Sequence, residues 1–427
     1  MTHKVKRWDR MGNENKKNIT DYIIHICTAI MISSFIIFDM DYRVSYILIG
    51  MTMLIFGLIA LRNRLKIWVK IENFHRYILL FIVYATCSSF WIYKPYLAIQ
   101  KAITVTEILI CMSVLYIYYS RYDSISDLYT ILMISGFIVV LYSVHKYGIS
   151  NIFSVLSRGD RLDDIFSNVN SIAMITSVAI IAFVYKILFE KTGILSTLIC
   201  SCLAVIGIII IAATGSRKAL VMLVLGAFLL FSIRFKSKHF IITLIEVCLV
   251  IGIMYFLLSQ LKNIEMFKGI VDRMDGLVAM MTGKGSVDAS ASTRAKFISI
   301  GIEQFKKRPI FGYGMGSSGK VLADVIGGKE TYFHNNYVEL LVCGGSVGTI
   351  IYYLIWLKPI KDIFKYRKYD TTAILSLIMA AILIVMDYGV VTYFDKLNYF
   401  YIMIMYICAK NSRRKRNEYK KGLQNYS

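Results

Sequence analysis

The chain has 427 residues, of which 57% are hydrophobic, and its mean hydropathy is +0.60. A soluble domain contains about 45–50% apolar residues, so the composition excludes an ordinary soluble protein and indicates a polytopic membrane protein. The formal net charge is +22. The basic residues lie in short segments between apolar runs, which indicates membrane topology and an anionic lipid or substrate, and argues against a nucleic-acid partner.

Two further features of the composition narrow the class. The 8 cysteines all lie within apolar segments, so we expect packing residues and neither disulfides nor metal ligands. No cleavage site follows the first apolar segment, which is therefore expected to remain as a membrane anchor.

The apolar segments predict an all-α fold. A helix needs about 20 apolar residues to cross the hydrocarbon core, and this criterion gives about twelve transmembrane helices. Residues 1–427 are then a single integral membrane domain. The predicted spans are 20–38, 44–61, 77–93, 102–119, 128–147, 168–189, 194–213, 217–233, 239–258, 334–357, 371–390 and 393–410.

Basic residues are concentrated in alternate connecting segments, which predicts the orientation. With an even number of spans, these segments fall on one side, and the positive-inside rule assigns that side to the cytoplasm. Both termini are then cytoplasmic, and residues 259–333 form one large extracytoplasmic loop with short helices. The basic segments read "KVKRWDR", "RNRLKIWVK", "RFKSKH", "KPIKDIFKYRK" and "RRKRNEYKK".

The segment "SRGDRLDDIFSNVNSIA" comes before the sixth predicted span, on the outer side. Arg161 precedes Asn168 and Asn170 there. Asparagine amides supply both donors and acceptors, which suit sugar hydroxyls. The alternative is that the asparagines only cap the helix.

The segment "TGSRKAL" opens the eighth predicted span. Ser216 is a candidate N-cap, which places Arg217 and Lys218 in the first turn. A helix N-terminus carries partial positive charge, so two cations there favour a bound anion. The alternative is that both side chains snorkel to the membrane surface.

The segment "STRAKFISIGIEQFKKRPIFGYGMG" predicts an amphipathic helix in the outer interface. We expect Ser292 or Thr293 to cap it and Pro309 to follow its end, with Arg294 in the first turn. The alternative for Arg294 is a solvated loop residue.

The nearby "GMGSSGK" nearly matches a phosphate-binding loop of nucleotide hydrolases. The match fails at Val321, where a hydroxyl should bind magnesium, and the segment faces away from cytoplasmic ATP. We therefore reject a nucleotide site and expect "GYGMG" to be a flexible turn beside the functional site.

His334 stands at the outer mouth of the tenth predicted span. In the first helical turn, the positive helix end would lower the pKa of its imidazole, which could then accept a proton from a hydroxyl group. The alternative is that His334 is an ordinary interface residue.

Together, these segments resemble the O-antigen ligase and polymerase superfamily, a group of polytopic bacterial glycan-assembly proteins. The resemblance covers about 157–348, and Val169 and Phe297 depart from the family pattern, which usually has proline and a nearby tryptophan. The matching residues, in order, are Arg161, Phe166, Asn168, Asn170, Ala173, Gly215, Ser216, Arg217, Thr293, Arg294, Pro309, Gly312, Gly314, Gly316, His334, Asn335, Gly345 and Gly348.

The resemblance implies a membrane glycosyltransferase. Its donor would be a sugar chain on undecaprenyl diphosphate, flipped to the outer leaflet, and the energy of that donor makes a cofactor unnecessary. Other partners would be membrane lipids and the flippase and chain-length regulator of the same pathway. It implies a diphosphate site of Arg217, Arg294 and Lys218, a catalytic His334, and glycan or acceptor contacts by Arg161, Asn168, Asn170 and Asn335.

The identity of the acceptor remains open. A lipid-linked repeat unit as acceptor would make the protein a polymerase of capsule, exopolysaccharide or O-antigen. The composition favours this alternative, because a chain rich in Ile, Lys, Asn and Tyr is typical of AT-rich genomes, which are often Gram-positive and lack lipid A. Another acceptor would make it a ligase. A polysaccharide transporter or flippase with a similar number of spans is a rival from another class. A metal-dependent glycosyltransferase using Asp39 and Asp41 is a further rival, although we expect no metal site.

Overall fold

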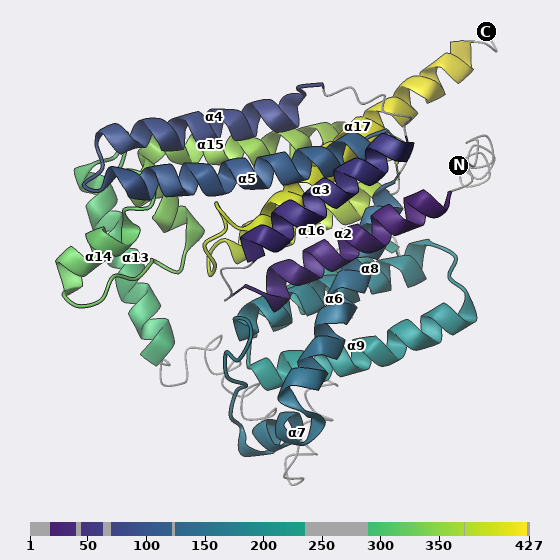
Figure 1. Ribbon diagram of the computed structural model, residues 1–427, viewed down its shortest axis with the longest axis horizontal. Coiled ribbons are helices and arrows are strands. Elements are labelled where there is room, and N and C mark those ends of the chain that lie inside the picture. The colour runs from purple at the N-terminus through teal and green to yellow at the C-terminus, as the bar shows by residue number, and fades with distance from the viewer. Residues whose placement is uncertain are drawn as a thin grey trace.

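The computed structural model describes residues 18–39, 44–62, 70–121, 124–234, 289–370 and 372–424. Within these ranges, the regular structure is entirely helical (Figure 1). In this part of the chain, 7 helices are long and apolar enough to cross a membrane, which confirms an α-helical integral membrane protein. They are α2 (Ile19–Ile37), α3 (Val44–Arg62), α5 (Pro95–Tyr119), α6 (Ile125–Tyr147), α8 (Val169–Phe189), α9 (Ile194–Thr214) and α15 (Asn336–Tyr366).

The remaining helices are shorter or more polar. Four of them coincide with predicted spans, namely α4 (Asn73–Cys87), α10 (Arg217–Arg234), α16 (Thr372–Met386) and α17 (Lys396–Gln424). Three others are α7 (Ile149–Arg158), α13 (Ala289–Lys307) and α14 (Ser318–Ile326), and 3-10 turns occupy Ser88–Phe90 and Arg367–Tyr369.

The helices agree with the predicted spans in number more closely than in boundaries. The predicted span 239–258 and the loop residues 259–288 lie outside the described residues, so the twelve-span topology stays a prediction. α5 begins earlier than predicted, at Pro95, because proline is well suited to the first turn. α15 and α17 continue past predicted residues 357 and 410 because hydropathy marks only the apolar part of a helix.

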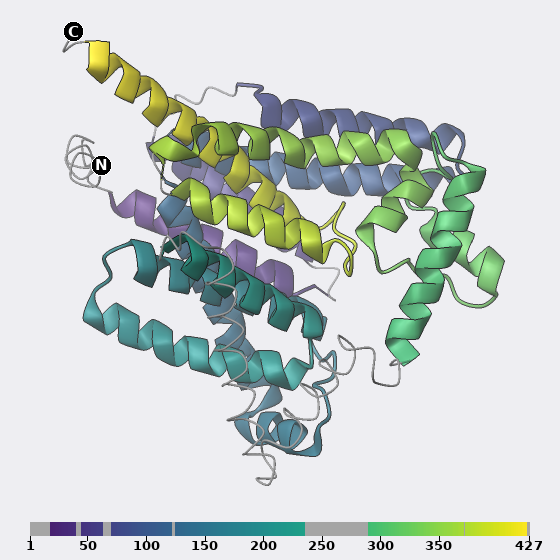
Figure 2. The ribbon, with the colours of Figure 1, turned by 180° about the vertical axis from the view of Figure 1, so that it is seen from behind.

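The helix bundle has two distinct ends. The start of α2 and the end of α17 lie together at one end, whereas α13 and α14 lie at the other, across the ends of α4 and α5 (Figures 1 and 2). We call the first the basic end, because it carries Arg62, Lys365 and Lys410, and we call the second the α13 end. α13 runs across the direction of α4 and α5, as expected for a helix in the membrane interface.

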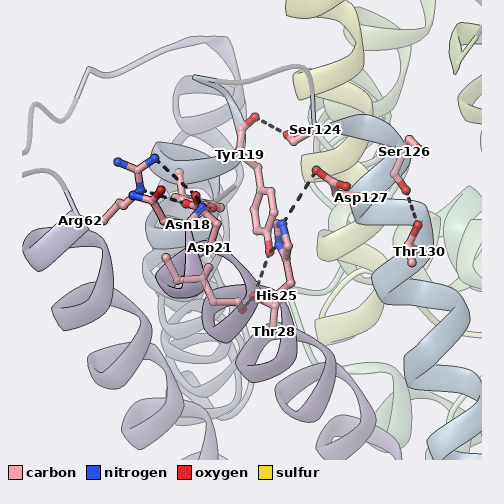
Figure 3. Close-up of polar contacts among 12 residues, drawn as sticks. Asn18, Asp21, His25, Thr28, Arg62, Tyr119, Ser124, Ser126, Asp127 and Thr130 are labelled. Atoms are coloured by element: carbon pink, nitrogen blue, oxygen red, sulfur yellow. Dashed lines mark hydrogen bonds and ion pairs between the residues drawn. The ribbon is translucent and has the colours of Figure 1, made fainter. Parts of the chain in front are cut away.

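Ion pairs and hydrogen bonds join the helices at the basic end. The Arg62 Nε lies 3.1 Å from the Asp21 Oδ1, and the Tyr118 hydroxyl donates to the same carboxylate at 2.7 Å. His25 lies beside the Tyr119 hydroxyl at 2.9 Å (Figure 3). These contacts link α2, α3 and α5, so the cluster has a structural role that sequence patterns did not indicate.

Side-chain hydroxyls join helices inside the bundle. The Ser33 hydroxyl of α2 donates to the Ser135 carbonyl of α6 at 3.2 Å, and the Ser135 hydroxyl donates to the Ala29 carbonyl at 3.1 Å. The Ser177 hydroxyl of α8 donates to the Ala219 carbonyl of α10 at 2.9 Å. Small polar residues allow such close packing between membrane helices, and here they fix the start of α10 against α8.

α15 is broken at Gly345, whose φ is 59°. The segment Pro309–Gly314 binds the backbone groups that the break releases. Tyr313 N donates to the Val342 carbonyl at 2.9 Å, and Ser346 N donates to the Pro309 carbonyl at 2.8 Å. Backbone groups at membrane depth must be paired internally, so this segment completes α15.

The same segment corrects the expectation of a flexible "GYGMG" turn. Gly312 has a φ of 65°, and a Cβ there would lie 2.5 Å from the Val342 carbonyl oxygen. Close backbone approach therefore requires glycine at this position. The residues after Gly316 form α14, so the rejected phosphate-loop match corresponds to a tight turn and the start of a helix.

Candidate functional site

His334 lies at the α13 end, immediately before α15. Its φ is 55°, and it is the sole non-glycine residue with positive φ in the described part of the chain. A left-handed backbone is costly for a residue with a side chain, and such strain is concentrated at functional sites. His334 precedes the N-cap Asn335, so the expectation that it occupies the first helical turn is wrong.

The backbone on both sides of His334 is fixed by side chains of α15. The Asn335 Oδ1 accepts from Val338 N at 3.0 Å, and the Glu339 Oε2 accepts from Phe333 N at 3.1 Å. Asn335 therefore caps α15, and Glu339 holds the chain that leads into the helix. Asn335 is 2% exposed, so its side chain serves the helix end in this structure.

The imidazole of His334 is surrounded by aromatic rings and cations. Its ring centroid lies 4.0 Å from that of Tyr332, and it stacks with Phe297 at 6.4 Å. Burial, followed by the positive charges of Arg294 and Lys218, lowers the pKa of His334 to about 4. The imidazole is therefore neutral at pH 7. The cause differs from the expected helix-end repulsion, because His334 is not part of the helix.

Arg294 approaches His334 from α13. The helix includes Ala289, so Arg294 lies beyond the first turn, and the prediction that Ser292 or Thr293 caps the helix is wrong. The helix does end before Pro309, as predicted. Phe297, one turn beyond Arg294, is 8% exposed and packs in a small core with Phe333 and other residues. This core holds α13 against the start of α15.

The first turn of α10 carries the cations Arg217 and Lys218, as the sequence predicted, and the charge of Lys218 acts on His334. The helix begins at Arg217, which is exposed, and the Lys218 ammonium group donates to the Gly389 carbonyl. Ser216 occupies the position before the helix and is 4% exposed. Its hydroxyl has no hydrogen-bond partner among the described residues, so the expected N-cap bond is not formed.

The segment containing Arg161 lies against the turn between α9 and α10. Leu162 N donates to the Ala213 carbonyl at 3.0 Å, and Arg161 itself is exposed. The Asn168 Oδ1 accepts from Asn170 N at 2.9 Å and from Asn170 Nδ2 at 3.1 Å. Asn168 therefore caps α8, while Arg161 is brought near the cationic turn.

A buried hydrogen-bond network behind His334 was not predicted from the sequence. The Asn336 amide donates to the Asp387 Oδ2 at 3.0 Å, and its Oδ1 accepts from Thr392 N at 2.9 Å. Asp387 also accepts from the hydroxyls of Tyr353 at 2.9 Å and Thr392 at 2.6 Å. These partners are far apart in sequence, so no local pattern could have indicated them.

The acidic residues considered for a metal site are only partly described. Asp39 is exposed, and its carboxyl interacts with the charges of Asp395 and Lys396, whereas Asp41 lies outside the described residues. In the described ranges, no group of three or more His, Cys, Asp or Glu residues is placed to hold a metal ion.

These observations define an α-helical integral membrane protein with an aromatic and cationic site at one end of its bundle. A family model described as O-antigen ligase matches residues 202–353, which contain Lys218, Arg294 and His334. The matched region is therefore similar to O-antigen ligases, which supports the resemblance seen in the sequence. No curated protein matches the sequence.

Proposed function

We propose that the protein is a polymerase of a bacterial surface polysaccharide, such as a capsule, exopolysaccharide or O-antigen. It transfers a glycan from undecaprenyl diphosphate to a hydroxyl group of a lipid-linked repeat unit, at the outer face of the cytoplasmic membrane. The observation that carries this proposal is a neutral imidazole, His334, placed beside the cations Arg294 and Lys218. A base and an anion site side by side suit transfer from a diphosphate to a hydroxyl group.

The diphosphate of the donor binds Arg294, Lys218 and Arg217 in this proposal. Guanidinium groups form bidentate hydrogen bonds with phosphate oxygens, and the N-terminus of α10 adds partial positive charge. When the bond between the anomeric carbon and the diphosphate oxygen breaks, the oxygen retains the electron pair. The cations stabilise the resulting negative charge.

His334 accepts the proton of the attacking hydroxyl group. The hydroxyl oxygen forms the new bond to the anomeric carbon, and the imidazolium later releases its proton to water. A pKa of about 4 makes the free imidazole a weak base. A bound diphosphate offsets the positive charges of Arg294 and Lys218, which raises the pKa of His334 and strengthens the base when donor is present.

The acceptor glycan reaches the site past the segment before α8. Arg161 and the free amide hydrogens of Asn170 and Asn168 contact its hydroxyl groups in this proposal. Asn335 contributes by fixing the backbone beside His334, because its side chain caps α15 and is 2% exposed.

The proposed orientation follows from the two ends of the bundle. The basic end, where α2 begins and α17 ends, faces the cytoplasm in this proposal, and the α13 end faces outward. A lipid-linked donor must reach this outer face, so the flippase and chain-length regulator of the same pathway are the proposed partners.

The family description favours ligation to a different acceptor as the second candidate. Deletion of the gene followed by analysis of surface glycans distinguishes the two. Single repeat units would support the polymerase, whereas intact polymer that stays lipid-linked would support the ligase. Purified protein in liposomes should lengthen a lipid-linked repeat unit, whereas movement of that unit across the bilayer without bond formation would indicate a flippase.

A further inference from the structure

A cavity of about 480 Å³ opens at the α13 end, away from His334. It lies between the turn that joins α4 to α5, the final turn of α13, and α14, the elements that meet at one edge of Figure 1. Its volume is within the range of roughly 300–1,000 Å³ that is usual for ligand sites. Its lining includes Trp91, Tyr93, Gln304, Arg308, Tyr313 and Lys320.

The cavity is distinct from the site around His334. α13 contacts His334 through Phe297, whereas Gln304 and Arg308 line the cavity near the helix end. At 1.5 Å per residue, Arg294 is separated by about 20 Å along the helix from Lys307, its last residue, which Arg308 follows. α13 therefore connects the site around His334 to the cavity. A chain of several sugars is long enough to reach from one to the other.

Aromatic rings form the walls of the cavity. Trp91 is held between Tyr84 and Phe311, with ring centroids 6.2 Å and 5.7 Å apart. Tyr93 is 76% exposed, although it is a large and partly apolar side chain. Exposed, amphipathic rings of this kind suit the faces of sugar rings, which present C–H groups between their hydroxyls.

Polar groups in the cavity have unused hydrogen-bonding capacity. The Gln304 Oε1 accepts from the Tyr313 hydroxyl at 3.0 Å, while its amide nitrogen has no partner in the described part of the protein. The Arg308 guanidinium lies 4.7 Å from the Tyr313 ring centroid and has no carboxylate partner in the described ranges. Lys320, by contrast, pairs with Asp324. Gln304 and Arg308 therefore offer donors to a ligand with hydroxyl or carboxylate groups.

We propose that this cavity is a saccharide-binding subsite for the glycan chain, several sugars away from the bond that forms at His334. The inference rests on the proposed function for the identity of the chain, but binding itself does not depend on catalysis. Tyr93 and Trp91 stack on sugar rings, and Gln304 and Arg308 donate to their hydroxyl or carboxylate groups. A polymerase with such a subsite retains the growing chain between successive transfers.

The test uses the full-length protein in nanodiscs and oligosaccharides released by mild acid from the surface polysaccharide of the cells that carry it. Binding is measured by saturation-transfer NMR and by tryptophan fluorescence, with Tyr93→Ala and Arg308→Gln as the variants. Tyr96→Ala and Lys306→Gln are matched controls, because both side chains are exposed and neither lines the cavity. Polymer length is measured in the same preparations with lipid-linked donor.

We expect Tyr93→Ala and Arg308→Gln to weaken oligosaccharide binding about tenfold, which corresponds to about 1.4 kcal/mol, and to shorten the polymer. The controls should match the parent protein. Equal binding in all five proteins would overturn the subsite, even if polymerisation continues. Binding that depends on Tyr93 in a protein that never lengthens glycan would support the subsite and reject the polymerase.

Discussion

The amide of Asn336 donates to the Asp387 carboxylate at 3.0 Å, and the backbone nitrogen of Asn336 donates to the Asp387 carbonyl at 2.7 Å. The pair joins the start of α15 to the loop after α16. That loop also carries Gly389, whose carbonyl accepts from Lys218 of α10. The loop after α16 therefore binds both Asn336, at the start of α15, and Lys218, whose charge acts on the His334 imidazole.

The first prediction concerns the base at His334. His334→Asn removes the imidazole but keeps a residue that tolerates the left-handed backbone observed at φ 55°. We expect glycan transfer to fall by about a hundredfold or more, the usual scale for loss of a general base, with little change in donor binding. Transfer is measured as initial rate in liposomes, and donor binding is measured separately in nanodiscs.

His334→Ala provides a useful comparison because alanine adopts the left-handed backbone less readily than asparagine. We expect it to lose thermal stability as well as transfer, so the asparagine variant isolates the chemical effect. A well-folded His334→Asn protein that makes polymer of normal amount and length would show that His334 is an interface residue.

The fold was predictable where a segment is both apolar and long. The composition and spacing indicated an α-helical membrane protein, and each predicted span within the described ranges has a helix. Helix ends were less predictable, because α15 and α17 continue into polar sequence that hydropathy does not mark. The break at Gly345 depends on pairing with Pro309–Gly314, a tertiary contact with no local signal.

The charged residues of the candidate site were predictable from the sequence, but the packing and hydrogen bonds that position them were not. Arg217, Lys218, Arg294 and His334 were recognisable because cations or a histidine stood beside expected helix ends. The local interpretation failed at Arg294 and His334, whose surroundings come from packing of α13 on α15 and not from a helix terminus. Asp387 carried no signal in the sequence because its partners come from other elements.

The second prediction concerns the break in α15. In Gly345→Ala, the new Cβ would lie 2.3 Å from the Ile310 carbonyl oxygen, at a φ of 59°. With a ψ of −165°, this backbone is in a region that is essentially restricted to glycine, where strain costs about 1–3 kcal/mol, and the clash displaces the segment that completes α15. We expect a lower thermal unfolding temperature and less protein in the membrane. Gly50→Ala is the control, since its Cβ would meet nothing within 4 Å, and equal stability of the two variants would contradict this account.

The third prediction concerns orientation. Single reporter cysteines at Lys329, between α14 and α15, and at Arg367, after α15, should lie on opposite sides of the membrane because α15 separates them. An impermeant thiol reagent added to intact cells should label the cysteine at position 329 and not that at 367. A background without the native cysteines removes other targets. Labelling of both positions, or of position 367 alone, would reject the proposed orientation.

The fourth prediction concerns metal dependence. The proposed step uses side-chain cations and an imidazole, so glycan transfer by purified protein should continue in excess EDTA. The measurement compares initial rates before and after chelation, with magnesium or manganese added back. Activity that disappears with EDTA and returns with either metal would contradict the proposed step and make Asp39 a candidate metal ligand. The Asp39 carboxyl lies close enough to Asp395 for the two charges to interact.

The fifth prediction tests the electrostatic coupling of Arg294 to His334. Burial is the largest cause of the low His334 pKa of about 4, and the charge of Arg294 is the next. Arg294→Gln removes that charge, so the pKa should rise toward its ordinary value. A protonated imidazole cannot accept a proton, so transfer falls as pH decreases through this pKa. The acid limb of kcat/KM, which reports the free enzyme, should therefore move to higher pH in Arg294→Gln.

The control for this shift is Lys296→Gln, which removes an exposed positive charge from the same helix. Its acid limb should coincide with that of the parent protein, because Lys296 is not among the causes of the low His334 pKa. The position of the limb on the pH axis, and not the height of the profile, is the readout, since Arg294→Gln also weakens donor binding. An unchanged limb in Arg294→Gln, or one displaced to lower pH, would mean that the imidazole whose protonation limits transfer is not beside Arg294.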